Sequence, residues 1–187
     1  ALIVTNGTVQ INGVGSLGDY TVQLGSGATN GILENYGAGG NFNQSFRIGN
    51  DLSTATGEGR ILNNGTGALN FTAGTFNHAW NANNDRTLTL GGSYTGDDNI
   101  ISGTIQDNIG VGGSVSVTKT GSGTWVLGGA NTYSGDTTVL GGTLGGRGTT
   151  GGGDLTLMSG STISPGNSIG KLMAGDTTWL GAISYEF

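Results

Sequence analysis

Apolar residues recur along the chain in short bursts in which they alternate with polar residues. Clusters of Gly, Asn and Ser separate the bursts. A period of two within such short, bounded stretches is typical of strands with one buried face. The bursts are Val9 and Ile11; Tyr20, Val22 and Leu24; Leu88 and Leu90; Val115 and Val117; Trp125 and Leu127; and Leu155 and Leu157. The sequence therefore predicts an all-β fold.

Composition narrows the classes of protein that fit this pattern. The 187 residues include 41 Gly, one Pro and no Cys, with 10% charged residues and a net charge of -6. Gly costs about 1 kcal/mol per helical position relative to Ala, which argues against a helical fold. Without Cys there is no disulfide or cysteine-ligated metal. Six Lys and Arg against twelve acids argue against a nucleic-acid partner. The alternating 34% of hydrophobic residues argues against a disordered linker.

The chain also repeats itself. Residues 96–105 align without gaps with 135–144 at an offset of 39, and 135–141 return as 175–181 at an offset of 40. A repeat of about half that length has a direct physical reading, because one coil cannot bury its own apolar side and must stack on its neighbours. We therefore expect a parallel β-solenoid with about 20 residues per coil and roughly nine coils stacked about 4.8 Å apart.

Two local features go with this interpretation. Leu144, Ile163 and Ile183 recur at nearly equal intervals, each close to one expected coil, so we expect them to form one column of the core. Asn-Gly pairs, which favour turns because Gly adopts a positive φ at low cost, begin at Asn6, Asn12, Asn30 and Asn64. A sandwich or antiparallel barrel of Asn-Gly hairpins is the competing all-β fold, but it does not require a fixed repeat.

The stretch 117–144, VTKTGSGTWVLGGANTYSGDTTVLGGTL, closely resembles the autotransporter-associated β-strand repeat, also called the passenger-associated transport repeat. Residues 88–105 resemble a weaker copy, and 163–172 is similar to a Pro-Gly-Asn-Ser segment that often follows such repeats. The positions that carry the resemblance are Lys119, Gly121, Gly123, Thr124, Leu127, Gly129, Asn131, Thr132, Tyr133, Gly135, Thr138, Val139, Gly142, Thr143 and Leu144.

This resemblance implies a right-handed parallel β-helix in the secreted or surface-exposed passenger of a large bacterial protein associated with the outer membrane. It implies no enzyme, but a stalk or adhesin whose repeat helps export and vectorial folding. Residues 1–187 are expected to form one β-helix segment of a longer passenger, since Ile183, Tyr185 and Phe187 alternate like an unfinished strand. The alternatives are a carbohydrate-binding or polysaccharide-degrading β-helix, and an extracellular fibre module that associates end to end.

Residues 76–86 hold the one histidine, His78, near Trp80, Asp85 and Arg86. Trp80 with the neighbouring Asn side chains suggests a glycan-contacting loop. A polar loop that bulges from the helix explains the same residues without a ligand, and we favour it, because a lone His supports neither a His-based metal site nor a proton relay.

Calcium is a second candidate ligand, at Asp97, Asp98 and Asn99. A calcium site needs six to eight oxygens from several positions, and the only sequence similar to a calcium-binding nonapeptide, 151–155, occurs once. We interpret Asp97, and Asp136 and Asp176 at matching positions, as turn residues that cap backbone N–H groups. We therefore assign no catalytic, cofactor-binding or metal-binding residue.

Other activities find less support. Twelve acids spread singly along the chain do not form the carboxylate pair that glycoside hydrolysis requires. A flat threonine row suited to ice would be broken, because the Thr pairs recur at every second coil. The chain has no apolar run long enough to cross a bilayer as a helix, so we expect no transmembrane helix and no direct membrane insertion. The Thr pairs of the broken row are Thr87 and Thr89, Thr137 and Thr138, and Thr177 and Thr178. Separately, potential N-glycosylation sites of the form Asn-x-Ser/Thr lie at Asn6, Asn43, Asn64 and Asn70.

Expected partners are a host-surface or matrix glycan or protein, or a second copy of the chain at either end. Binding would run along the outer face, where segments such as 76–86 and 106–114 interrupt the coils.

Overall fold

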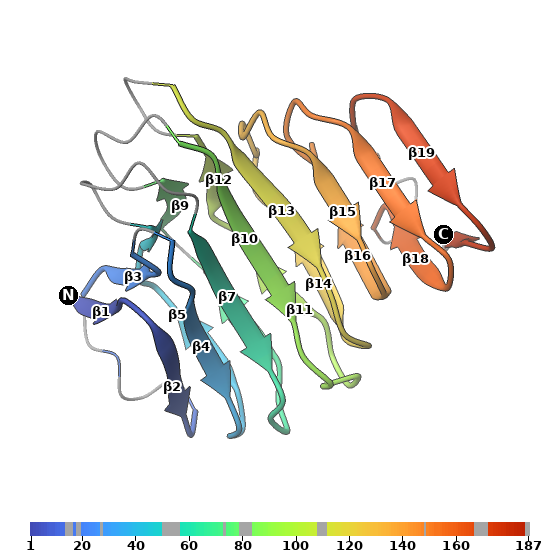
Figure 1. Ribbon diagram of the computed structural model, residues 1–187. Coiled ribbons are helices and arrows are strands. Elements are labelled where there is room, and N and C mark those ends of the chain that lie inside the picture. The colour runs from blue at the N-terminus through green and yellow to red at the C-terminus, as the bar shows by residue number, and fades with distance from the viewer. Residues whose placement is uncertain are drawn as a thin grey trace.

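The computed structural model describes residues 1–13, 17, 20–26, 28–49, 57–72, 74–78, 84–107, 112–147, 149–166 and 172–185. In this part of the chain the named elements are all strands, and their pairings are all parallel. The strands form three sheets that run along one axis, with the two termini at opposite ends (Figure 1). The protein is a parallel β-helix, as the sequence predicts.

Each sheet takes one strand from successive coils. The eight-stranded sheet contains β2 (Gly7–Ile11), β4 (Gly31–Asn35), β7 (Glu58–Asn63), β10 (Arg86–Gly91), β13 (Val115–Lys119), β15 (Thr137–Val139), β17 (Leu155–Met158) and β19 (Thr177–Leu180). The seven-stranded sheet contains β5 (Gly40–Phe42), β8 (Leu69–Phe71), β11 (Asn99–Ile101), β14 (Thr124–Leu127), β16 (Gly142–Gly146), β18 (Ser161–Ser164) and β20 (Ser184–Tyr185). The five-stranded sheet contains β1 (Leu2–Val4), β3 (Val22–Leu24), β6 (Phe46–Ile48), β9 (Thr75–His78) and β12 (Thr104–Gln106).

Coil length changes along the rod. In the N-terminal part Gly7 pairs with Gly31 and Gly31 with Gly59, and these coils are longer than the sequence repeat predicts. Beyond β12 the five-stranded sheet ends, and the coils shorten to the spacing seen in the pairs Val117–Thr137, Thr137–Leu155 and Leu155–Thr177. The predicted coil length is therefore right for the C-terminal coils. It is wrong for the N-terminal ones, because each of those includes a third strand.

The sequence repeats correspond to the coils only in part. The offset of 40 is confirmed, because it relates β15 to β19, two coils apart in the same sheet. The offset of 39 is wrong as a stacking relation, since it aligns β11 of the seven-stranded sheet with β15 of the eight-stranded sheet. Similar Gly-bounded strands occur on both faces of a coil, and sequence similarity alone does not distinguish the faces.

The predicted column of Leu144, Ile163 and Ile183 is confirmed for its first two members, which are register partners. Ile163 then pairs with Tyr185 instead of Ile183. Because the last coil of this sheet is longer than the one before it, the register moves two positions beyond the expected residue.

Inward side chains fill the rod in columns. In one column Ile61, Leu90, Lys119, Val139 and Leu157 are successive register partners, and all five are fully buried. A neighbouring cluster is aromatic, with Phe42 stacked on Phe71 and Phe46 stacked on Phe76, each pair with ring centroids 4.8 Å apart, and with Trp125 packed against Phe71. This continuous core is what stacking of coils is expected to produce.

Two kinds of glycine explain the Asn-Gly pairs. Gly7 and Gly13 adopt positive φ angles of 92° and 90°, as the turn prediction requires. Gly31 instead begins β4, where a Cβ atom would lie 2.2 Å from the backbone nitrogen of Gly25. The pair Asn30-Gly31 is therefore a place where two backbones approach closely, and the prediction of a positive-φ turn there is wrong.

A candidate binding groove on the seven-stranded sheet

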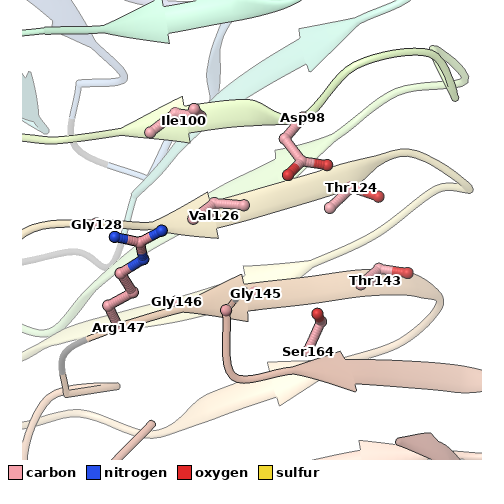
Figure 2. A pocket seen from close by; sticks show the side chains of 11 residues that line it. Asp98, Ile100, Thr124, Val126, Gly128, Thr143, Gly145, Gly146, Arg147 and Ser164 are labelled. Atoms are coloured by element: carbon pink, nitrogen blue, oxygen red, sulfur yellow. The ribbon is translucent and has the colours of Figure 1, made fainter. Parts of the chain in front are cut away.

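The outer face of the seven-stranded sheet carries a groove of about 520 Å³ that crosses β11, β14, β16 and β18 (Figure 2). A cavity of that size is in the range of small-ligand sites. It is lined by Asp98, Ile100, Thr124, Val126, Gly128, Thr143, Gly145, Gly146, Arg147, Ser164 and Gly166. The groove lies partly on the segment that resembles the transport repeat, and no pattern in the sequence predicts it.

Small residues at outward positions create the hollow. Ile100, Val126, Gly145 and Ser164 are successive register partners on the outer face. The first two provide an apolar ledge, and the chain then has no side chain at Gly145. A Cβ atom there would lie 3.1 Å from both the Ser164 carbonyl oxygen and Val126 Cγ2, so even Ala would crowd this position. Gly145 thus occupies an outward position of its strand, but it adds no side-chain volume there, and this leaves the hollow.

Two opposite charges mark the ends of the groove. Figure 2 shows the Arg147 guanidinium lying over the end of β14 near Gly128, and Asp98 directed toward Thr124. Two strand spacings and four residue rises separate Asp98 from Arg147, which places their Cα atoms on the order of 16 Å apart. Among the described residues neither side chain forms an ion pair or hydrogen bond. Both are exposed, so both are available to a ligand.

Other aspartates of the rod are used differently. The carboxylates of Asp85, Asp107, Asp136 and Asp154 accept hydrogen bonds from backbone N–H groups of later coils, for example Asp154 N to Asp136 Oδ1 at 3.0 Å. The capping role predicted for Asp136 is thus confirmed. Asp98, whose carboxylate has no such bond in the described part of the chain, is free of this structural task.

Hydroxyl groups lie between the two charges. Thr124 and Thr143 are register partners, and Ser164 lies one strand further along on the next outward position. Their side chains are partly exposed and form no hydrogen bond within the described residues. The groove therefore offers hydroxyl donors and acceptors, one carboxylate and one guanidinium around an aliphatic ledge.

Buried polar groups fix the strands beneath the groove. Asn35, Asn63 and Asn99 form a ladder in which Nδ2 of one amide donates to Oδ1 of the next, at 2.9 and 2.7 Å. Asn99 Nδ2 then donates to the Thr124 carbonyl oxygen at 2.9 Å. The Asn99 Oδ1 atom also accepts from Leu69 N. Asn99 is therefore an interior tie, and its part in the suggested calcium site is wrong.

Lys119 is buried at the same corner of the rod. Its Nζ donates to the carbonyl oxygens of Thr120, Gly121 and Gly141 at 2.8, 3.1 and 2.9 Å, so that the ammonium joins two coils. Burial lowers the pKa of Lys119 to about 8. All three donors of the ammonium are satisfied by carbonyls, which is how a buried cation without a carboxylate can be tolerated.

A second hollow, of about 380 Å³, lies at the last coil and is largely apolar. Trp179 and Tyr185 are register partners of the buried Leu157 and Ile163, yet they are 52% and 48% exposed. They point inward, and no described coil covers them.

The residues singled out from the sequence lie elsewhere. His78 ends β9, where it pairs with Ile48, and Trp80 lies outside the described residues. Asp85 caps Ser114, while Arg86 is buried in the core and desolvation lowers its pKa. Residues 79–83 of the suggested glycan-contacting loop lie outside the described residues, so that suggestion stays a prediction. Asn167 and Ser168 of the Pro-Gly-Asn-Ser segment also lie outside it.

The expectation of a broken threonine row is wrong. Thr89, Thr118, Thr138, Thr156 and Thr178 are register partners on five consecutive strands of the eight-stranded sheet. The sequence repeat with an offset of 40 relates Thr138 to Thr178, which are two coils apart. Thr118 and Thr156 lie on other coils of the row, and the repeat did not indicate them. Within the described residues, no group of three or more His, Cys, Asp or Glu is placed to hold a metal ion.

The comparisons bear on the same segment that carries the groove. Residues 117–145 match the model of the passenger-associated-transport-repeat family. This segment is similar to the passenger-associated transport repeat. The matched segment includes β14 and most of β16, and it contributes Thr124, Val126, Gly128, Thr143 and Gly145 to the groove.

The chain is also 35% identical, over 128 residues, to the adhesin BmaC autotransporter of Brucella suis biovar 1 (strain 1330). That alignment covers 60% of this chain and 4% of the relative, so the chain spans a small part of the length of the protein it matches. No solved structure matches the chain significantly. The transport repeat, the autotransporter relative and the β-helix agree on a passenger region. The described residues contain no apolar helix with the length needed to span a bilayer.

Proposed function

We propose that the chain is a section of the β-helical rod of an adhesin-like passenger at a bacterial surface, and that residues 117–145 assist its export and ordered folding. The family match and the adhesin relative support the surface role. Neither is described as an enzyme, and the groove lining contributes one carboxylate, Asp98, where glycoside hydrolysis uses a pair. The proposal is accordingly a structural and binding role without catalysis.

One observation carries the folding role: the repeat ties the coil before it to the coil after it. Asn131 Oδ1 accepts from Ile105 N, and Asn131 Nδ2 donates to the Thr149 carbonyl oxygen, both at 3.0 Å. Thr149 Oγ1 donates back to the Asn131 carbonyl at 2.6 Å. Because coils contact only adjacent coils, a segment bonded in both directions is suited to start or hold a growing rod.

The transition between coil types occurs at the same place. The five-stranded sheet ends at β12, and beyond it the repeat continues the third side of the rod with Asn131 and Tyr133 in place of a strand. Tyr133 is fully buried, and its hydroxyl lies 2.7 Å from Thr137 Oγ1. The repeat therefore adds specific side-chain bonds to the few backbone bonds that join the coils on this side, such as Thr132 N to the Ile105 carbonyl oxygen at 2.9 Å.

The test is a surface-display assay in which this segment forms part of a passenger attached to an autotransporter translocation unit. Asn131→Ala removes the bonds in both directions, and Thr156→Ser serves as the matched control on an outward position of the next coil. We expect Asn131→Ala to reduce the fraction of passenger accessible to external protease, at equal total expression, while the control resembles the parent. Equal display of Asn131→Ala, with lowered stability of the purified chain, would refute the export role and leave only a packing role.

A further inference from the structure

We infer that the groove on the seven-stranded sheet binds a short oligosaccharide that carries one acidic sugar, with the sugar carboxylate at Arg147 and sugar hydroxyls at Asp98, Thr124, Thr143 and Ser164. This inference deepens the adhesin-like role proposed above and rests on it for its biological meaning. The binding itself is a property of the groove and is tested separately.

The polar groups of the groove are available to a ligand, because within the described residues they form no bond that holds the fold. Within the described residues, Asp98 and Arg147 have no ion pair or hydrogen bond, whereas Asp85, Asp107, Asp136 and Asp154 cap backbone N–H groups of later coils. The hollow at Gly145 is kept open by its surroundings, since a Cβ atom there would crowd Val126 and the Ser164 carbonyl oxygen.

Charge selects a ligand with a single anionic group. Arg147 is the one cation among the described lining residues, and a guanidinium matches a carboxylate with two parallel hydrogen bonds. The net charge of -6 repels polyanions, so neither nucleic acid nor a heavily charged polysaccharide fits. A ligand with one carboxylate at one end meets attraction at Arg147 and avoids Asp98.

The remaining lining selects hydroxyls and apolar ring faces. A carboxylate such as Asp98 accepts hydrogen bonds from hydroxyls, and Thr and Ser hydroxyls both donate and accept. Ile100 and Val126 give a flat apolar ledge between these groups. The length of the groove, on the order of 16 Å between the Cα atoms of Asp98 and Arg147, suits several linked rings better than one.

A peptide fits this groove less well. Peptides that bind sheets usually add a strand at a free edge, where main-chain N–H and C=O groups are unpaired. The groove instead lies across β11, β14, β16 and β18, which are consecutive neighbours in the sheet and pair with one another. Recognition there depends on side chains alone, which favours a ligand rich in hydroxyls.

The experiment measures binding to the purified chain by calorimetry with three probes. They are a trisaccharide that ends in glucuronic acid, the same trisaccharide ending in glucose, and a tetrapeptide with free termini. We expect the acidic trisaccharide to bind more tightly than the neutral one, by about tenfold at low salt and less at high salt, because the carboxylate pairs with an exposed guanidinium.

Variants locate the site. Arg147→Gln is expected to remove the preference for the acidic trisaccharide and to leave affinity for the neutral one within about twofold. Arg47→Gln, on the outer face of β6 in the five-stranded sheet, changes the net charge equally and is expected to change nothing. Gly145→Val, which fills the hollow but also crowds Val126 and the Ser164 carbonyl oxygen, is expected to abolish binding of both sugars and to lower the thermal midpoint, so the location of the site is decided by Arg147→Gln.

Three outcomes would overturn the inference: no binding of either trisaccharide up to about 10 mM, equal loss of binding in Arg147→Gln and Arg47→Gln, or tighter binding of the tetrapeptide than of the acidic sugar. The last would indicate a protein partner at this face. Because Arg147→Gln can also be run in the surface-display assay, the two proposals fail separately. Loss of sugar binding with normal display concerns the groove alone, and loss of display with normal sugar binding concerns the export role alone.

Discussion

Replacing Lys119 by Met is the sharpest test of how the rod is held together. Met keeps the volume of the side chain in its column between Leu90 and Val139, but leaves the carbonyls of Thr120, Gly121 and Gly141 without the ammonium. Burial disfavours the ammonium relative to the neutral amine, as its lowered pKa shows, but Met removes every donor, and each carbonyl left without its partner costs about 1–3 kcal/mol. We expect the free energy of unfolding to fall by about 1–3 kcal/mol at pH 7.

The pH dependence gives an independent magnitude. The pKa of Lys119 is about 8 in the folded chain and 10.5 for the ordinary amine, so between these values the unfolded chain binds more protons and stability rises with pH. The full difference corresponds to about 3 kcal/mol, and solvent screening at the corner of the rod reduces it to about 1–2 kcal/mol. This gain disappears as the pH falls through 8, because Lys119 is then protonated in both states.

Urea unfolding followed by far-ultraviolet circular dichroism, at intervals from pH 7 to pH 9.5, measures both effects. The parent should gain stability relative to Lys119→Met as the pH rises, and taking the difference between the two proteins removes the titration of all other groups. Parallel curves for parent and variant would show that Lys119 is not a buried cation. A variant more stable than the parent at pH 7 would show that desolvation outweighs the three carbonyl bonds.

Three further substitutions test the packing. Asn63→Ala should lower the free energy of unfolding by about 2–4 kcal/mol, because it interrupts the buried amide ladder. Thr66→Ala, at a nearby exposed position, should cost under about 1 kcal/mol by the same urea titration. Gly31→Ala should reduce the thermal midpoint strongly, since its Cβ would meet backbone at 2.2 Å, and Gly112→Ala, with no atom within 4 Å, should leave it nearly unchanged. Phe71→Ala, in the aromatic cluster, should cost about 3–5 kcal/mol, and a loss below about 1 kcal/mol would contradict the stacked core.

The fold was predictable because alternation and repetition are both local signals. Val115 and Val117, or Trp125 and Leu127, alternate inward with the period of a strand, and all four are fully buried. Parallel stacking followed from the repeat length, since no single coil can bury these residues alone. The N-terminal coils differ from the predicted coil length because their third strand adds length without adding a new kind of pattern.

The groove, and the buried polar side chains that bond one coil to the next, were not predictable in the same way. Lys119 and Asn131 were noted as positions of the transport repeat, but nothing local distinguishes a lysine facing a carbonyl cage from one facing water. The hollow at Gly145 depends on register, which the sequence specified only to within two positions, as the pairing of Ile163 with Tyr185 shows. Carboxylates such as Asp98 and Asp136 look alike in sequence, and only the positions of neighbouring N–H groups separate a cap from an unused side chain.

Inward and outward side chains of each strand have different roles, and this explains how one rod can carry a binding site at little cost in stability. Inward residues such as Leu90 and Val139 are fixed by their columns, while outward residues contact only the neighbours on either side. A change at Arg147, which is exposed at the end of β16, therefore alters what the groove can bind without disturbing the core. Gly145 is the exception, because its hollow is enclosed by Val126 and Ser164, and substitutions there affect ligand and packing together. Binding specificity in such a rod can thus change through its charged rim, whereas the position of the groove depends on the glycine.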